Sequence, residues 1–392
     1  NPTHLAIARQ TALESLVLLE NRDEALPLDR DALNSLAVIG PLADDGYEQM
    51  GTWVFDGDAS LSVTPLRSIR DHLGDDVKVK YVRALETSRS RSTTGFSEAV
   101  AAAKNADAVV LFLGEESILS GETHSRADIG LPGSQEQLIA AVRETGRPLI
   151  LVIMAGRPLT LSSVRDQVNA LLFAWHPGTM AGPAITDILF GAESPSGKLP
   201  ATFPRMVGQE PIYYNHKNTG RPPSPEKFTH MDDIPPRFPQ HSWGFASFHL
   251  DAGYTPLYPF GYGLSYTEFE YSDIKVSPAE FRPGGEITIQ ATVHNTGPRE
   301  AEEVVQLYVR DLVGDVTRPV RELKGFERVR LVPGERKQVT FRLSAEDLAF
   351  YGQDMTRIIE PGEFHAWVGG SSSAELGTSF SLLPPAQSTE PQ

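Results

Sequence analysis

Three glutamates, Glu115, Glu116 and Glu122, stand close together in a polar stretch that follows an apolar run. Paired carboxyl groups suit the cleavage of a glycosidic bond, because one protonates the leaving oxygen while another attacks the sugar or activates water. A glutamate beside apolar residues can hold its proton near neutral pH. Three neighbours could supply such surroundings: Ile118, Leu119 and Ile129. The alternative is a solvated acidic loop without a catalytic role, and composition alone favours it.

Trp53 is a second candidate for contact with a sugar, because it lies between glycines in the stretch Gly51–Asp58. An aromatic side chain on a loop can present a flat apolar face to a sugar ring. The alternative is a tryptophan buried in the core. The same stretch contains Asp56-Gly57-Asp58, but it lacks the spaced ligands and the closing glutamate of an EF-hand loop, so we expect no calcium site.

Other chemistries are disfavoured by composition and by missing motifs. The 392 residues include no cysteine, which excludes disulfides, thiol nucleophiles and zinc–thiolate sites. The ten histidines show no metal-binding spacing, and there is neither a phosphate-binding glycine loop nor a G-x-S-x-G elbow. We therefore expect no metal and no cofactor. The formal net charge of -16 argues against nucleic acid and anionic membrane as partners, and no apolar run is long enough to span a bilayer.

Residues 31–214 are predicted to form the α/β domain that positions these side chains. Apolar runs alternate with helical patterns, which is typical of a mostly parallel sheet covered on both faces. The predicted strands are 36–41, 77–82, 109–113, 148–154 and 169–175, and the predicted helices are 97–107, 135–144, 164–167 and 184–190. The glutamate cluster follows the strand 109–113, and the carboxyl ends of such strands are where open α/β sheets place their chemistry.

A terminal helix is predicted over residues 3–20, within a connecting segment 1–30, from apolar residues at near-helical spacing. Its apolar surface is generous for a helix at the end of a chain. We therefore expect it to pack against another part of the protein.

Beyond residue 214 the character of the sequence changes twice. Residues 215–265 are an irregular segment rich in proline and aromatic residues, and its prolines exclude a regular helix or a central strand. Residues 266–383 carry short alternating stretches separated by turn motifs such as Pro-Gly and Asn-Thr-Gly, which predict a β-sandwich of the immunoglobulin or fibronectin type III class. The tail, residues 384–392, is predicted to be disordered.

Several motifs together resemble family 3 glycoside hydrolases, particularly the bacterial periplasmic β-glucosidases. They are ALESLVLLEN at 12–21, Gly114-Glu115 with Ser120-Gly121-Glu122, SRAD at 125–128, WHPG at 175–178, PSGKLP at 195–200 and YPFGYGLSY at 258–266. Their joint order and spacing make the match specific. Together they reach from the first helix to the start of the predicted β-sandwich.

The resemblance implies a retaining, exo-acting glycosidase with three parts: an N-terminal (β/α)8 barrel, an α/β sandwich domain and a C-terminal fibronectin type III-like domain. In such enzymes the nucleophile is an aspartate on the barrel, and the acid/base is a glutamate from the α/β domain. That glutamate matches Glu122 in this sequence. Glu115 is the runner-up and, with Trp53, is assigned to substrate binding.

No segment of this chain matches the barrel, so the nucleophile cannot be named from it. The expected partners are therefore a barrel domain and a β-glucoside or oligosaccharide substrate. The helix at residues 3–20 matches the connection that follows the barrel in the family. The resemblance also implies a periplasmic or secreted protein. Two alternatives stay open: a β-xylosidase of the same family, and a non-catalytic carbohydrate-binding or scaffold module.

Overall fold

The computed structural model describes residues 1–240 and 245–386, and the chain divides into two compact units that interleave in sequence. The first unit comprises Asn1–Leu199, Phe203–Glu210 and Tyr262–Tyr266. The second unit comprises Pro200–Thr202, Pro211–Gly261 and the chain from Thr267 on. The segment boundaries proposed from the sequence stay a prediction.

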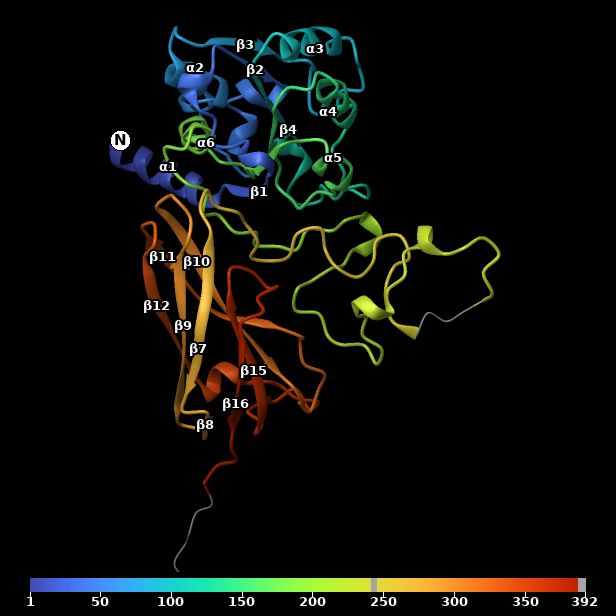
Figure 1. Ribbon diagram of the computed structural model, residues 1–392, viewed down its shortest axis with the longest axis vertical. Coiled ribbons are helices and arrows are strands. Elements are labelled where there is room, and N and C mark those ends of the chain that lie inside the picture. The colour runs from blue at the N-terminus through green and yellow to red at the C-terminus, as the bar shows by residue number, and fades with distance from the viewer. Residues whose placement is uncertain (241–244, 387–392) are drawn as a thin grey trace, which may run out of the picture. The chain divides into compact units, whose positions relative to one another are not determined.

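A mixed sheet with the strand order β1-β6-β5-β4-β2-β3 forms the centre of the first unit (Figure 1). Its strands are β1 (Val17–Asn21), β2 (Ser35–Ile39), β3 (Lys78–Val82), β4 (Ala108–Gly114), β5 (Leu149–Met154) and β6 (Ala170–Phe173). Strands β2 to β6 pair in parallel, and β1 pairs antiparallel with β6. The predicted α/β domain with a mostly parallel sheet is confirmed.

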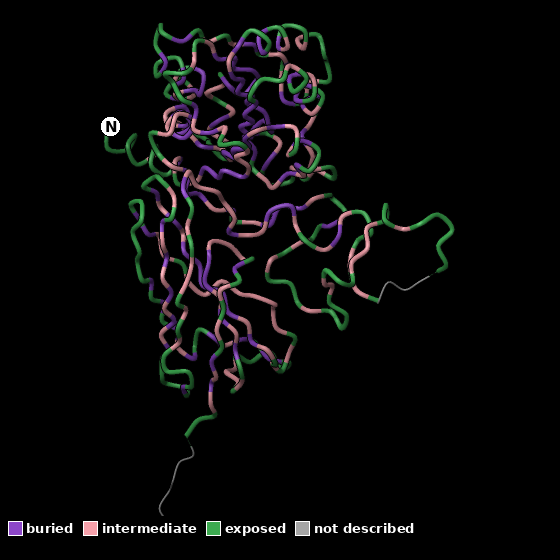
Figure 2. Tube along the Cα trace, in the orientation of Figure 1, coloured by how far each residue is buried: buried purple, intermediate pink, exposed green. Residues whose placement is uncertain are grey.

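Helices gather on both faces of this sheet. They are α1 (Pro2–Ser15), α2 (Pro65–Leu73), α3 (Phe96–Lys104), α4 (Gln135–Arg143), α5 (Ser162–Arg165) and α6 (Ala181–Leu189). Figure 1 shows α1, α2 and α6 together on one side of the unit and α3, α4 and α5 together on the other. Two covered faces explain why β4 and β5 are buried over their whole lengths, as Figure 2 shows for the centre of the unit.

The predicted helix 3–20 is wrong in its last five residues. Helix α1 ends at Ser15, and Val17–Asn21 is the edge strand β1. Val17, Leu18 and Leu19 are fully buried, because both faces of the strand are covered. A continuous apolar run of this kind also satisfies helical spacing, so the pattern did not distinguish the strand from a longer helix. The expected packing of α1 is found in part: Ala12 is buried and Arg9 pairs with Asp187 of α6 at 2.5 Å.

Helix α2 was not predicted, although its signals are local. Thr64 accepts a hydrogen bond from the backbone N–H of Arg67 as N-cap, and Pro65 occupies the first turn. The helix buries Leu66, Ile69 and Leu73 at helical spacing against the sheet core.

The second unit contains a β-sandwich, as predicted. One sheet has the order β11-β10-β15-β16-β8 and the other the order β12-β9-β7. The strands are β7 (Phe269–Ser277), β8 (Glu280–Phe281), β9 (Glu286–Asn295), β10 (Ala301–Asp311), β11 (Glu322–Leu331), β12 (Arg336–Ser344), β15 (Gly362–Gly369) and β16 (Gly377–Leu382), with a separate hairpin β13 (Phe350–Tyr351) and β14 (Arg357–Ile358). Alternating apolar residues of both sheets form its core.

Residues 211–240 and 245–261 carry only short 3₁₀ turns and bridges, in line with the irregular segment predicted from their prolines. Phe228 packs there against Phe248 and Tyr254 at ring-centroid distances of 5.3 and 6.2 Å. Of the predicted tail, residues 387–392 lie outside the described part. Among the helices of the described residues, none combines the length and the apolar character that crossing a bilayer requires.

Candidate active site

Four loops meet at one edge of the sheet, because the carboxyl ends of parallel strands lie on the same side. They follow β2, β4, β5 and β6 and carry Trp53, the glutamate cluster, Arg157 and His176. The strand β4 ends at Gly114, which has a φ of +138°. A Cβ on Gly114 would lie 1.9 Å from the carbonyl oxygen of Met154, so only glycine allows the chain to leave the sheet there.

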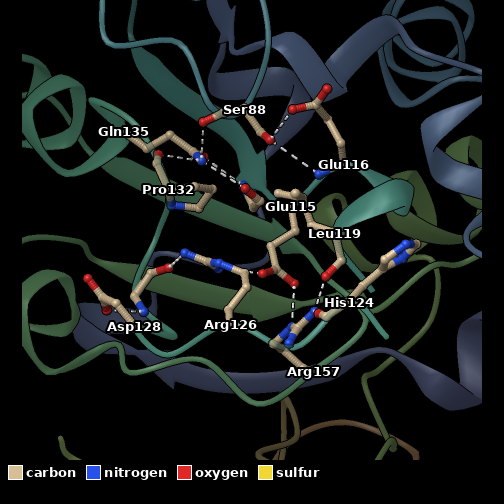
Figure 3. Close-up of polar contacts among 12 residues, drawn as sticks. Ser88, Glu115, Glu116, Leu119, His124, Arg126, Asp128, Pro132, Gln135 and Arg157 are labelled. Atoms are coloured by element: carbon tan, nitrogen blue, oxygen red, sulfur yellow. Dashed lines mark hydrogen bonds and ion pairs between the residues drawn. The ribbon is translucent and has the colours of Figure 1, made fainter. Parts of the chain in front are cut away.

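Glu115 is buried, and Figure 3 shows its carboxylate bound by two arginines. Its Oε1 accepts from Nη1 of Arg126, and its Oε2 accepts from Nε of Arg157 at 3.1 Å. Glu115 is 1% exposed and both of its carboxylate oxygens are engaged, so it anchors the loop. Its assignment to substrate binding stays a prediction.

The two arginines extend this anchor to the backbone of the loop. Arg157 donates through Nη2 to the carbonyl oxygens of Leu119 and His124, the latter at 2.9 Å. Arg126 donates through Nη2 to the carbonyl oxygen of Gly130 at 2.9 Å. The three acceptors lie before Glu122 (Leu119) and after it (His124 and Gly130), so these bonds fix the loop backbone on both sides of Glu122. We use the name Glu115 clamp for Glu115, Arg126 and Arg157.

Glu116 points into a different network. Its carboxylate accepts from the hydroxyl of Ser88 at 2.8 Å and from Nε and Nη2 of Arg89 at 2.9 and 3.1 Å. Burial disfavours the charged form of Glu116, but the hydrogen bonds from Arg89 and Ser88 outweigh this effect and lower its pKa. A carboxyl group held in its charged form is a poor proton donor, so Glu116 also serves to hold the loop.

Gln135 braces the root of the loop and was missed by the sequence analysis. Its Oε1 accepts from the backbone N–H of Gly114 at 2.7 Å. Its Nε2 lies within hydrogen-bond distance of the carbonyl oxygens of Ser88, Gly114 and Pro132 (Figure 3). Its position at the start of the predicted helix 135–144 gave no signal of this role, because polar residues are ordinary at that end of a helix.

Glu122 lies exposed at the tip of the loop, between Gly121 with a φ of +111° and Thr123 with a φ of +65°. Within residues 1–240 and 245–386 its carboxylate has neither a hydrogen bond nor an ion pair. The apolar surroundings expected from Ile118, Leu119 and Ile129 do not enclose Glu122, because Glu122 is exposed and Ile118 is itself 56% exposed. Of the three clustered glutamates, Glu122 is thus the one that can reach an outside molecule.

Trp53 lies beside the same turn. A Cβ built on Gly121 would be 3.5 Å from two atoms of the Trp53 ring. The hydroxyl of Thr52 lies within hydrogen-bond distance of two carbonyl oxygens that precede this turn. They are those of Ser117, at 2.6 Å, and Ser120, at 3.1 Å. The ring is 57% exposed, so the alternative of a core tryptophan is wrong. Trp53 and the turn of Glu122 therefore share one surface.

Asp56 and Asp58 do not assemble a cation site. Asp58 instead accepts from the backbone N–H and the hydroxyl of Ser60, at 2.9 and 2.6 Å, and so begins a short 3₁₀ turn. Over the part of the chain that the structure describes, no group of three or more acidic or histidine side chains is arranged to hold a metal ion.

His176 lies in the WHPG motif at 175–178, but no role was assigned to it from the sequence. It follows β6, and its ring lies against the backbone of Gly51, where a Cβ would be 2.8 Å from Cγ of the imidazole. Burial lowers the pKa of His176 to about 4, with the backbone carbonyl of Glu48 acting weakly in the opposite direction. The imidazole is therefore neutral at neutral pH. Its place in that motif, just after the buried strand β6, was the signal that could have identified it.

Removing the charge of Glu115 should destabilise the first unit strongly. In Glu115→Gln, two partly buried guanidinium groups lose their buried counter-ion, which we expect to lower the free energy of unfolding by about 3 kcal/mol. The control Glu98→Gln breaks an exposed pair with Lys80 and should cost under about 1 kcal/mol. Urea unfolding of both variants measures the difference, and equal losses would contradict the clamp.

His176 should make stability depend on pH in a defined window. Since its pKa is depressed in the folded state, the unfolded chain takes up the proton first as the pH falls below 6.5, and stability is lost from there down to about 4. Between pH 6.5 and 4 we expect the His176→Phe variant to lose less free energy of unfolding than the unaltered chain, by up to about 3 kcal/mol. Unfolding midpoints across pH 4–7 test this, and parallel pH profiles for the variant and the unaltered chain would refute it.

Comparison with known sequences supports the resemblance. A family model described as the glycosyl hydrolase family 3 C-terminal domain matches residues 16–266, and a fibronectin type III-like domain matches residues 303–372. A periplasmic β-glucosidase of Salmonella typhimurium is 43% identical over 97% of this chain and 50% of its own length. A β-xylosidase of Formosa agariphila is 38% identical over 95% of this chain and 49% of its own length.

Solved structures agree with these relatives. A β-glucosidase from Listeria innocua in complex with isofagomine superposes with a TM-score of 0.87 and 36% identity, over 98% of this chain and 51% of that chain. A β-glucosidase from Erythrobacter marinus gives a TM-score of 0.83 and 31% identity, over 97% of this chain and 51% of that chain. The chain spans about half the length of the curated relatives it matches. On these grounds it belongs to glycoside hydrolase family 3 and carries the C-terminal domain of that family.

Proposed function

We propose that this chain supplies the acid/base half of a retaining, exo-acting β-glucosidase, with Glu122 as the acid/base residue. The observation that carries the proposal is the contrast within the glutamate cluster. Glu115 and Glu116 are tied to arginines, whereas Glu122 is exposed on a loop that those two residues hold in place. A proton donor for an outside substrate needs this combination of a fixed backbone and a free carboxyl group.

The reaction is a double displacement. In the first step an aspartate attacks the anomeric carbon, the glycosidic C–O bond breaks, and the proton of Glu122 passes to the departing oxygen. In the second step the Glu122 carboxylate takes a proton from water, the water oxygen bonds to the anomeric carbon, and the bond to the aspartate breaks. The two carboxyl groups of a retaining enzyme lie about 5–5.5 Å apart.

The aspartate is proposed to belong to an N-terminal barrel domain, which is the partner of this chain in the complete enzyme. The chain's span of about half of its relatives supports this partner. Trp53 is proposed to flank the leaving group, because its exposed ring lies beside Gly121 next to the acid/base residue. The name of the Salmonella relative supports a periplasmic or secreted location.

Glu122→Ala in the complete enzyme tests the role of Glu122. Glucosides with poor leaving groups should be cleaved about 10²–10⁴-fold more slowly, because their departing oxygen needs the proton. Aryl glucosides with acidic leaving groups should lose much less in their first step. Added azide should restore turnover and give a glucosyl azide, since azide attacks the intermediate without a general base.

Glu144→Ala is the matched control, because Glu144 is an exposed carboxylate at the end of α4. It should leave every rate unchanged. Unaltered cleavage of poor substrates by Glu122→Ala, or a failure of azide to change the rate, would remove Glu122 from this role.

β-Xylosidase activity is the second candidate, and the Formosa relative at 38% identity is what favours it. We expect aryl β-glucoside to be preferred over aryl β-xyloside by about tenfold or more in kcat/KM, since one hydroxymethyl group commonly contributes this much discrimination. Parallel assays of the complete enzyme decide between the two sugars. A preference for the xyloside would replace glucose by xylose without changing the role of Glu122.

A further inference from the structure

The short turn that precedes Glu122 is held at both ends by the loop that follows β2. This turn is the 3₁₀ helix Ser117–Leu119, and the N–H of Ser120 closes it by donating to the carbonyl oxygen of Ser117 at 3.2 Å. At the start of the turn, the backbone N–H of Ser117 donates to Oε2 of Glu48 at 2.5 Å. A residue of the β2 loop therefore fixes the point where the turn begins.

Thr52 contacts the other end of the turn with both branches of its side chain. Its hydroxyl lies 2.6 Å from the carbonyl oxygen of Ser117 and 3.1 Å from that of Ser120, and the two oxygens compete for its single proton. Its methyl group lies against Gly121, where a Cβ would be 2.7 Å from Cγ2 of Thr52. Gly121 directly precedes Glu122, so Thr52 contacts the backbone that carries the proposed proton donor.

The β2 loop is in turn fixed to the edge of the sheet by Gln49. This side chain is fully buried, and its Nε2 donates to the carbonyl oxygen of Gly178 at 2.9 Å. The backbone N–H of Gly178 donates back to the carbonyl oxygen of Gln49 at 2.9 Å. Gly178 lies on the loop after β6. Thr52 therefore stands on a segment that has its own support, independent of the loop that carries Glu122.

Trp53 follows Thr52 directly and lies beside the same turn. A Cβ on Gly121 would be 3.5 Å from two atoms of the Trp53 ring. Trp53 and Thr123 have φ values of +68° and +65°, a conformation that residues other than glycine keep only where their surroundings fix it. The backbone on both sides of this contact is thus held in one arrangement.

We propose that Thr52 is a positioning residue whose hydroxyl fixes the location of Glu122 relative to Trp53. This inference rests on the proposed function of Glu122. The other side-chain contact to the carbonyl oxygen of Ser120, from Nδ1 of His124 at 3.0 Å, comes from the same loop and cannot tie that loop to another part. Thr52 supplies this tie, and the proton donor and the ring that flanks the leaving group then form one unit. A misplacement of about 1 Å in such a pair can slow a reaction about 10²-fold.

Kinetics of Thr52→Val in the complete enzyme test the positioning role, because valine keeps the shape of threonine and removes only its hydroxyl. We expect kcat/KM for glucosides with poor leaving groups to fall about fivefold to tenfold, the factor that one hydrogen bond of this kind contributes. For activated aryl glucosides kcat/KM should stay nearly unchanged, since their departing oxygen needs no proton. Thr52→Ser keeps the hydroxyl and should retain at least about half of the parent rate on both kinds of substrate.

Thr145→Val is the matched control. The hydroxyl of Thr145 also donates to a backbone carbonyl oxygen, that of Val142 at 2.7 Å, but Thr145 precedes β5 and so lies at the opposite edge of the sheet. This variant should leave every rate unchanged. Equal losses of Thr52→Val on both kinds of substrate, no loss on either, or a Thr52→Ser variant as slow as Thr52→Val would overturn the positioning role.

Amide hydrogen exchange over residues 117–124 of the complete enzyme supplies a readout that needs no turnover. Thr52→Val should raise exchange of these amides about fivefold, whereas Thr52→Ser and Thr145→Val should match the parent. Exchange unchanged in Thr52→Val would overturn the inference, even if Glu122→Ala behaves as expected. If instead Thr52→Val speeds exchange but Glu122→Ala fails its own test, the proposed function has failed and the positioning role fails with it.

Discussion

The carboxylate of Glu115, buried between two arginines, is the interaction on which the candidate site depends. Moving a carboxylate out of water costs several kcal/mol unless opposite charges and hydrogen bonds replace its hydration. Arg126 and Arg157 supply both, and their remaining N–H groups bind carbonyl oxygens of the loop. A loop of polar, largely exposed residues is thereby held to the end of β4. Glu122 can then be exposed and yet have a fixed backbone.

The fold was predictable where local pattern and final surroundings agree. The apolar runs of β4 and β5 predicted strands buried on both faces, and they are buried over their whole lengths. The helix predicted over 3–20 fails at Val17 because β1 is defined by pairing with β6, about 150 residues further along the chain, and no local pattern reveals such a partner. Helix α2, in contrast, had readable signals in Thr64, Pro65 and its apolar spacing.

The candidate site was predictable only in part, for a similar reason. Motifs led to Glu122, and the glycines around Trp53 led to an exposed ring beside the same turn. The role of Glu115 could not be read from its own stretch, because one of its two arginines, Arg157, follows a different strand. Gln135 and His176 were missed because their importance lies in what they contact, not in their residue type. Only the long-range contacts at the sheet edge show that Glu115 and Glu116 anchor the loop, whereas the carboxylate of Glu122 is exposed.

If this chain supplies the proton donor and another part of the enzyme supplies the nucleophile, trapping the covalent intermediate tells the two carboxylates apart. A 2-deoxy-2-fluoro-β-glucoside with a good leaving group slows release of the sugar from the nucleophile, and mass spectrometry of the digested complete enzyme locates the sugar ester. We predict an ester on an aspartate outside residues 1–392 and none on this chain. An ester on Glu122, or on any other carboxylate of residues 1–392, would contradict this account.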